Sequence, residues 1–539
     1  MKSHENDVIV VGSGHNGLVA AAYLAKAKKK VLVLERQAYF GGGVASAEFT
    51  LPGFHHERHG LVHAKIMANP LITADELELQ SRHGLSYLRP ADSYGALFED
   101  GSWLGLSPDR ERTLTSLASV APEDVDAYRE FAAFASDVVQ GMIPGFFSPP
   151  TGLGAMLAEW EGSPTGGRLA RMMLQSAHDV IREHFASEKL RVALLRLVAE
   201  LLIVHPDEKG TGLFAVAAVG FVDRFGFAIP KGGGSAFTQA LLRCIEGHGG
   251  VARASSTVTE VIVRQGRAVG VQTDDRGQMF ANDAVVASIH PHRLGDVVPG
   301  LSRSLVEQAK KVQLSHYTGF VVHAALAAPL RFRNDHANDC AMVAVGATGL
   351  DATLHGFDRL KRGSLSDEPL LWSSALCDPD RAPTGKGVLH CYCMTTYDLG
   401  GNGPRGWERR KEAYAALVLE RLRAFTHPLQ FEAGSDPLIV SPLDHERDTP
   451  SFAGGDLNGA GMFLHQTGSL RPTTALSQFA VPGAAGLYLV GPFMHPGGGI
   501  TGGGRATAIR IFDDLGMRFE GVRHGERPAP QQLVRPSQA

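Results

Sequence analysis

The sequence predicts an α/β protein built from two interleaved domains, one a parallel sheet covered by helices and the other of α+β type. Three observations indicate this class. A strand, a glycine-rich turn, a helix, a second strand and an acidic residue follow one another within residues 7–35. Glycine-rich segments that precede helices recur at 230–235 and 492–504. The chain of 539 residues is also too long for one hydrophobic core, which makes two domains the default.

The first stretch has the order of a dinucleotide-binding βαβ unit. The β-branched run Val8–Val11 suits a buried parallel strand, and Val31–Leu34 suits a second one. Between them lies a G-x-G-x-x-G turn that consists of Gly12, Ser13, Gly14, His15, Asn16 and Gly17. Its glycines permit a tight turn, the close approach of a diphosphate and the packing of the next helix on the strand. We therefore expect a Rossmann-like domain.

An acidic residue ends the second strand. The carboxylate of Glu35 can accept hydrogen bonds from ribose hydroxyls, and it would repel a 2′-phosphate. Arg36 follows directly, and we expect it beside the same cofactor. The helix at 18–27 offers free N–H groups and partial positive charge to a diphosphate at its N-terminus. This stretch alone leaves open whether the dinucleotide is FAD or NAD.

Composition excludes several other classes of function. The chain is 44% hydrophobic and 20% charged with a net charge of −4, which gives no electrostatic case for nucleic acid. The first strand starts too early for a signal peptide, and no apolar run is long enough to span a bilayer. Five cysteines without a C-x-x-C pair fit reduced thiols. We expect a cytoplasmic protein, with peripheral membrane contact and the oligomeric state left open.

A glycine pair follows the acidic strand end. In Tyr39–Ser46, Gly41 and Gly42 let another backbone segment approach closely. The G-x-G-x-x-G turn, the acid and this pair resemble the FAD-binding start of the flavin amine oxidase and phytoene desaturase superfamily. The resemblance implies that Gly42, Gly43 and Val44 lie against FAD. Many members carry Arg or Lys after the pair, so Gly43 removes one expected cation near the flavin phosphates.

Two later segments extend the resemblance. Glycine-rich residues 230–235 precede a helix at 236–248 and strands at 251–254, 258–264, 268–273 and 284–288. In the superfamily, the residue that corresponds to Val258 meets the adenine through its backbone. The strand at 487–490 and the helix at 505–515 flank a segment that resembles the closing motif, whose flavin-contacting residues correspond to Gly491, Pro492, His495, Gly499, Ile500 and Thr501. Two glycine-rich helix starts can clamp one extended FAD, so we expect FAD and no second dinucleotide site.

The resemblance is most specific in residues 441–471 and the HPGGG stretch at 495–499. They are most similar to the branch that contains desaturase-type carotenoid ketolases and pyridine nucleotide-disulfide oxidoreductase domain 2 proteins. We assign 1–107, 229–290 and 430–539 to an FAD-binding domain of glutathione-reductase type, and 108–228 and 291–429 to the substrate domain. The apolar segment 211–229 is expected between the domains, against the substrate cavity. The segment 142–160 is either a buried loop cap or an apolar portal for a lipophilic substrate.

Three residues are candidates for a catalytic role. His495 either handles a proton or fixes the backbone before Pro496. His59 belongs to a region that folds back near the flavin in the resembling superfamily. Arg471 either stabilises negative charge on reduced flavin or pairs with an acid in the core.

Two charged or histidine-rich segments receive simpler interpretations. His55, His56, His59 and His63 lie in a loop without an acid or cysteine cluster, so we predict no metal. Asp444–Arg447 is expected to be a solvated charged turn that contains His445.

Together these features predict an FAD-dependent dehydrogenase or oxidase that resembles phytoene desaturase. We expect it to desaturate a small hydrophobic substrate, of isoprenoid or carotenoid type, by hydride transfer to flavin N5. The sequence shows no second nucleotide fold, so NAD(P)H is not expected to reduce the flavin, and the electrons leave to O2 or a quinone. Oxidation of an amine or another activated C–H bond is the first alternative. A flavin-bound binding protein with little turnover is the second.

Overall fold

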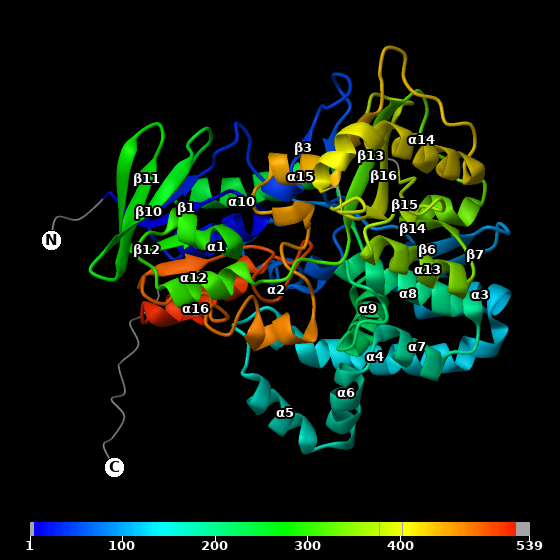
Figure 1. Ribbon diagram of the computed structural model, residues 1–539, viewed down its shortest axis with the longest axis horizontal. Coiled ribbons are helices and arrows are strands. Elements are labelled where there is room, and N and C mark those ends of the chain that lie inside the picture. Colours follow the sequence, from blue (N-terminus) through cyan, green and yellow to red (C-terminus); the bar gives the residue numbers. More distant parts are fainter. Residues whose placement is uncertain (1–4, 377, 402, 524–539) are drawn as a thin grey trace.

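The chain folds into two sheets that lie side by side, each with helices against it (Figure 1). The structure is a computed structural model, and it describes residues 5–376, 378–401 and 403–523. The predicted α/β fold, with a Rossmann-like domain interleaved with a second domain, is confirmed.

The first sheet holds the predicted dinucleotide-binding unit. Its seven strands follow the order β10 (Val258–Arg264), β11 (Arg267–Thr273), β12 (Gly277–Ala287), β1 (Asn6–Val11), β2 (Val31–Leu34) and β9 (Val251–Arg253), with β18 (Leu487–Leu489) paired to β12. β1 runs parallel to β2 and β12, whereas β10, β11 and the start of β12 form an antiparallel meander. Val8, Ile9 and Val10 are fully buried because helices or loops cover both faces.

Alternate residues of β1 and β2 serve two separate cores. Val8 and Val10 pack toward α1 (His15–Lys26), α10 (Gly234–Gly247) and α16 (Gly504–Asp514). Ile9 packs on the opposite face, toward α11 (Leu294–Val297) and α12 (Arg303–Lys310). A Cβ at Gly504 would lie 1.9 Å from the Asn16 carbonyl oxygen, so α16 crosses α1 at a distance that only glycine allows.

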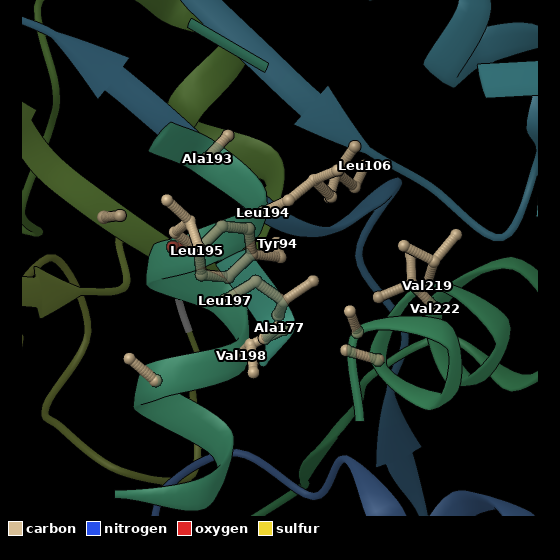
Figure 2. Packing of buried hydrophobic residues seen from close by; sticks show 14 of the residues in the cluster. Tyr94, Leu106, Ala177, Ala193, Leu194, Leu195, Leu197, Val198, Val219 and Val222 are labelled. Atoms are coloured by element: carbon tan, nitrogen blue, oxygen red, sulfur yellow. The ribbon is translucent and has the colours of Figure 1, made fainter. Parts of the chain in front are cut away.

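The second sheet is mostly antiparallel. Its order is β17 (Leu438–Val440), β13 (Thr318–Leu326), β16 (Gly387–Thr395), β15 (Leu371–Ser373), β14 (Cys340–Ala347), β6 (Asp92–Phe98) and β7 (Trp103–Leu106), and β14 and β6 form its parallel pair. α14 (Trp407–Phe425) packs on one face. The other face meets a helical layer. Tyr94 of β6 and Leu106 of β7 pack on this side near Leu194 and Leu197 of one helix and Val219 of another (Figure 2).

The strand pairing differs from the expected domain limits in two places. Residues 92–106 and 438–440 were assigned to the FAD-binding domain, but β6, β7 and β17 pair in the second sheet. The physical reason is strand pairing: β6 pairs with β14, an apolar strand that was not predicted, β7 pairs with β6, and β17 pairs with β13. A short ladder of β5 (Tyr87–Leu88) and β8 (Ile229–Pro230) lies where the chain passes between the domains.

The helical layer fills residues 110–225. It consists of α3 (Arg110–Val120), α4 (Val125–Phe146), α5 (Leu153–Glu161), α6 (Pro164–Leu174), α7 (Ala177–His184), α8 (Glu188–Leu202) and α9 (Gly212–Phe225). α4 continues through Pro144, and the buried Phe147 follows it. The segment 142–160 is therefore not a buried loop cap: it consists of the end of α4, a short connection in which Phe147 and Pro150 are buried, and α5, none of whose residues is buried.

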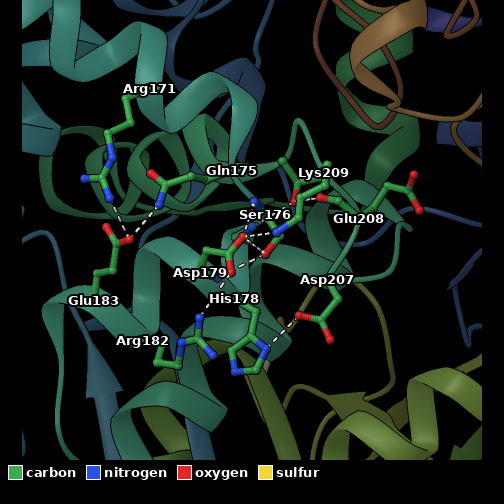
Figure 3. A network of polar contacts seen from close by, with 12 residues as sticks. Arg171, Gln175, Ser176, His178, Asp179, Arg182, Glu183, Asp207, Glu208 and Lys209 are labelled. Carbon is green, nitrogen blue, oxygen red and sulfur yellow. Dashed lines mark hydrogen bonds and ion pairs between the residues drawn. The ribbon is translucent and has the colours of Figure 1, made fainter.

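Polar contacts fix the α6–α7 corner. Ser176 and Asp179 form a reciprocal capping box at the start of α7, and Lys209 pairs with Asp179 (Figure 3). The remaining elements are β3 (Ser46–Ala47), β4 (His56–Glu57), α2 (Pro70–Thr73), α13 (Leu350–Lys361), α15 (Pro442–Asp448), α17 (Phe519–Arg523) and short 3-10 turns. Within the described ranges, no helix is long and apolar enough to cross a membrane.

Candidate cofactor and substrate site

A cavity of about 510 Å³ lies where the two domains meet. Its ribose end is lined by Glu35, Arg36, Ser256, Thr257 and Val258. The G-x-G-x-x-G turn lines its middle. Its inner end is lined by Leu201, Ile203, Met342, Trp372, Tyr392 and Leu457. The cavity therefore joins a dinucleotide-binding turn to the second domain.

Glu35 is held in one orientation at the ribose end. Its Oε2 accepts hydrogen bonds from the Ser13 N–H at 2.8 Å and the Ser13 hydroxyl at 2.7 Å, and its Oε1 accepts one from the Gln37 N–H at 2.8 Å. The Ser256 N–H donates to the Glu35 carbonyl at 2.8 Å, which brings Val258 to the same end. Ser13 does not line the cavity itself; it orients the carboxylate that does.

The glycine-rich turn leaves room for a diphosphate. Gly14 borders the cavity, and a Cβ built on it would meet no protein atom within 4 Å. Gly42 lies on the other side, where a Cβ would be 3.1 Å from the Gly14 Cα. The first turn of α1, at His15, Asn16 and Gly17, also lines the cavity and presents unpaired backbone N–H groups. The residues present therefore fit a dinucleotide diphosphate.

The C-terminal segment approaches from the opposite side. Gly491, Pro492, Gly499 and Ile500 line the cavity together with Gly42, Gly43 and Val44, so both glycine-rich helix starts border one space. Thr501 does not line it. The Thr501 carbonyl instead accepts a hydrogen bond from the Asn69 side chain at 2.9 Å, which holds the C-terminal segment against the N-terminal part of the FAD-binding domain.

Gly43 has a structural explanation. A Cβ at this position would lie 2.7 Å from Cζ of Phe452 and 3.8 Å from Cδ2 of His59. The aromatic ring therefore occupies the space into which a longer side chain at position 43 would extend.

His59 lines the cavity as a member of a polar cluster. Its Nδ1 lies 2.8 Å from Nδ1 of His445, and its Nε2 lies 3.5 Å from the carboxylate of Asp448. Burial lowers the pKa of His59, although the Asp448 carboxylate 3.5 Å away opposes this. Burial alone would raise the pKa of Asp448, but the neighbouring His59 and the charge of Arg58 lower it to about 2.

The environment of His445 corrects the expectation of a solvated turn. Pro442–Asp448 forms helix α15, and His445 on its inner face is fully buried. The side chain of Arg447 is 56% exposed on the outer face. Within one helical turn, a buried histidine and a solvated arginine thus lie on opposite faces. The composition of this charged stretch does not reveal which of its side chains is buried.

His495 and Arg471 lie outside the cavity lining. His495 Nε2 lies 3.0 Å from the Gly145 carbonyl, which ties the closing segment to α4, and burial lowers the pKa of His495 to about 4. The Arg471 guanidinium is fully buried, and its hydrogen bonds go to the backbone carbonyls of Asn458, Ala460, Gly461, Gln466, Pro492 and Met494. Of the three expected catalytic residues, the structure brings only His59 to the cavity.

The inner end is mainly apolar. Trp372 and Tyr392 stack there with ring centroids 5.4 Å apart. Glu200 also borders this end, but its side chain has no exposed surface and pairs with Arg196 at 2.9 Å. Segment 211–229 was expected to face the cavity. Instead α9 packs within the helical layer, and α8 supplies the lining residues Glu200 and Leu201.

Sequence reasoning missed several charged lining residues, which are Glu200, Arg293, Asp448 and, most notably, Lys65. No motif marks Lys65, because its significance depends on partners at positions 201 and 498 that the fold brings together. The described residues contain no group of three or more His, Cys, Asp or Glu side chains placed to hold a metal ion.

Comparison with known proteins identifies the class to which this fold and site belong. A family model described as flavin containing amine oxidoreductase matches residues 17–510. The chain belongs to the flavin-containing amine oxidoreductase family, and its cofactor is FAD. It is an oxidoreductase.

Individual relatives are distant but cover nearly the whole chain. It is 24% identical to a subunit of the limonene dehydrogenase of Castellaniella defragrans, over 95% of each chain. It is 27% identical to pyridine nucleotide-disulfide oxidoreductase domain-containing protein 2 of Rattus norvegicus, over 95% of this chain and 94% of that protein. It is 24% identical to the lycopene-forming phytoene desaturase of Pseudescherichia vulneris, over 94% and 99%. A cofactor-redesigned triple mutant of putrescine oxidase shares the fold, with a TM-score of 0.61, 17% identity and coverage of 95% and 98%.

Proposed function

We propose that this protein dehydrogenates a small hydrophobic substrate of the isoprenoid kind and passes the electrons to O2 or a quinone. FAD, when bound, supplies a hydride acceptor at N5. The chain's own contribution is to hold an apolar substrate at the inner end, orient it and exclude water from it.

The observation that carries this proposal is the lining of the inner end. Leu201, Ile203, Met342 and Leu457 present apolar side chains, and the acidic side chain at this end, Glu200, is turned away into its pair with Arg196. A hydrocarbon gains free energy by leaving water for such a surface, whereas a charged substrate would lose hydration without a partner. Two relatives support the same class, since their names refer to limonene and phytoene, which are isoprenoid hydrocarbons.

Anaerobic reduction of the FAD-loaded enzyme tests the proposal. The enzyme is mixed with a cyclic monoterpene, a linear polyene, a primary amine and NADPH in separate experiments, and the visible absorbance of the flavin is followed. Bleaching by one of the hydrocarbons and not by NADPH is expected. Bleaching by NADPH alone would refute the proposal, and no bleaching by any compound would favour a binding protein with little turnover.

A pair of variants locates the substrate. Trp372→Ala enlarges the inner end and is expected to raise KM for the hydrocarbon while FAD content stays at the wild-type level. Phe431→Ala truncates a partly buried aromatic ring outside the cavity lining and serves as the matched control. Equal KM values for the two variants would place the substrate elsewhere.

Oxidation of an amine is the second candidate, and the stacked pair of Trp372 and Tyr392 favours it. Aromatic faces attract an ammonium group by cation–π interaction. If the amine bleaches the flavin and the hydrocarbons do not, this candidate replaces the first.

Peripheral contact with a membrane is part of the proposal for a lipophilic substrate. Helix α5 has no buried residue, although Leu153, Met156, Leu157 and Trp160 lie along it. Such a helix can rest in a lipid interface. Co-flotation with lipid vesicles, lost in a variant with Met156 and Leu157 changed to Ser, is the expected result.

A further inference from the structure

Lys65 is a partly buried lysine at the junction of the two domains. It begins the short 3-10 turn Lys65–Ala68 and lines the cavity. Its Nζ donates hydrogen bonds to the carbonyl of Gly498, in the C-terminal cofactor segment, and to the carbonyl of Leu201 in α8, at 3.2 Å. This one side chain thus connects the N-terminal part of the FAD-binding domain to the C-terminal cofactor segment and to the substrate domain.

The charge of this lysine has no acidic partner among the described residues. Among the residues that the structure describes, no Asp or Glu oxygen lies within ion-pair distance of Lys65 Nζ. Both of its hydrogen-bond acceptors are backbone carbonyls. Burial lowers the pKa of Lys65 to about 7, and the nearby charge of Arg471 contributes to this shift. An ammonium has three N–H donors, so two carbonyls leave one for a ligand. A partly buried cation that faces a cavity and has no acidic partner gains from a negative charge that arrives in that cavity.

The position of Lys65 along the cavity indicates which part of FAD it meets. Glu35 and Val258 mark the ribose end, and the first turn of α1 marks the diphosphate. Because the cofactor is extended, its ring system must lie beyond the diphosphate, toward the inner end. Lys65 lies on that side, and its Cε would be 3.1 Å from a Cβ at Gly499.

We propose that Lys65 contacts the flavin ring system and stabilises the negative charge that the ring gains on reduction, which makes FAD easier to reduce. The two electrons come from the substrate as a hydride, and the acceptor is O2 or a quinone as above. The inference requires bound FAD but no particular substrate, so its test is independent of the proposed reaction.

Three substitutions separate charge from packing. Lys65→Met removes the charge and the donor, Lys65→Gln keeps a donor without charge, and Lys65→Arg keeps the charge. Each FAD-loaded protein is reduced against a dye of known potential, and each oxidised protein is titrated with sulfite, an anion that adds to flavin when positive charge is near. We expect the Met and Gln variants to bind sulfite at least tenfold more weakly. Their reduction equilibrium should shift tenfold toward the oxidised flavin, which lowers the reduction potential by about 30 mV for two electrons. The Arg variant should stay within about threefold of wild type, less than 1 kcal/mol.

Lys26→Met is the matched control, because Lys26 Nζ also donates to a backbone carbonyl, that of Glu76 at 2.7 Å, but does not line the cavity. FAD-loaded Met and Gln variants with wild-type sulfite affinity and potential would overturn the proposal. If the Met variant loses FAD, the Gln and Arg variants are compared instead. Equal sulfite affinities and equal reduction potentials for these two variants would also overturn the proposal. Loss of FAD from all three would show that Lys65 acts through packing alone.

Discussion

At the scale of single residues, Arg471 shows how a buried cation can organise backbone instead of reacting. Its guanidinium donates to six carbonyls from two segments, 458–466 and 492–494, the second of which includes the cavity-lining Pro492. The planar fork of arginine supplies five N–H donors in fixed directions. Burial lowers the pKa of Arg471 only to about 10, so it stays charged at neutral pH.

We therefore expect Arg471→Met to damage the fold before it damages the chemistry. Buried carbonyls left without donors destabilise the protein, and we expect a loss of about 3 kcal/mol or more. Thermal unfolding and FAD content measure the effect. Arg510→Met, which breaks the half-exposed pair with Asp514, is the control and should cost less than about 1 kcal/mol. Equal stability of the two variants would contradict this role.

A second residue-scale feature is a group of buried histidines beside the cavity. His323 and His390 are directly opposed on β13 and β16, and the ring centroids of His56 and His323 are 5.6 Å apart. None of the ring nitrogens of His323 and His390 has a hydrogen-bond partner in the described structure. Burial lowers the pKa of His390 to about 3 and that of His56 to about 4. These side chains are neutral in the folded protein and bind protons only when it unfolds.

Stability should therefore fall with acid. Between the ordinary pKa of 6.5 and the folded value of about 3, the unfolded state binds one more proton at His390. The free energy of unfolding then drops by about 1.4 kcal/mol per pH unit for each such histidine. Urea unfolding between pH 7 and pH 4 measures the slope.

His390→Leu isolates one member of the group. It should leave stability at pH 7 nearly unchanged or raise it, because the leucine has no polar atom to satisfy. It should also reduce the acid slope by about one proton. An unchanged slope would show that His390 is already protonated or hydrated in the folded state.

At the scale of elements, the β1–α1–β2 unit was predictable because its signals are local. The strand run, the glycine spacing and Glu35 follow one another in the sequence, and the structure keeps them in that order. β14 was not predicted, since an apolar run of its length fits a buried strand or a helix equally well. α15 was predicted as a turn because its charged residues conceal one buried face.

Two glycines of the same turn should respond differently to alanine. A Cβ at Gly14 projects into empty cavity space, so Gly14→Ala should fold normally and bind FAD at least tenfold more weakly. A Cβ at Gly17 would lie 2.7 Å from the Gly12 carbonyl, so Gly17→Ala should lower the thermal stability of the FAD-free protein. FAD titration and thermal unfolding of the FAD-free proteins distinguish them. A stability loss in Gly14→Ala that equals that of Gly17→Ala would contradict the assignment of the cavity.

At the scale of the whole molecule, the cavity is lined by both domains, so FAD should couple their stability. A saturating ligand at 100 times its Kd stabilises the folded state by about 2.7 kcal/mol. We expect FAD to raise the unfolding temperature of the whole chain in a single transition. FMN lacks the adenosine that we expect the cavity-lining Glu35 and Val258 to hold, so it should raise the unfolding temperature much less. Equal shifts with FMN would show that the ribose end contributes no binding energy.

The sequence by itself determined the cofactor-binding unit, the α/β class and both glycine-rich segments, because each depends on residues that are neighbours along the chain. It could not determine which charged side chains face the cofactor. His59 meets His445, Lys65 meets Leu201 and Gly498, and Arg471 binds two separate loops, each through contacts between residues far apart in sequence. Only the tertiary structure decides such contacts, since they form when segments far apart in the sequence fold around one cavity. The inner end, where we place the substrate, depends entirely on that folding, because its lining residues come from separate segments of the chain.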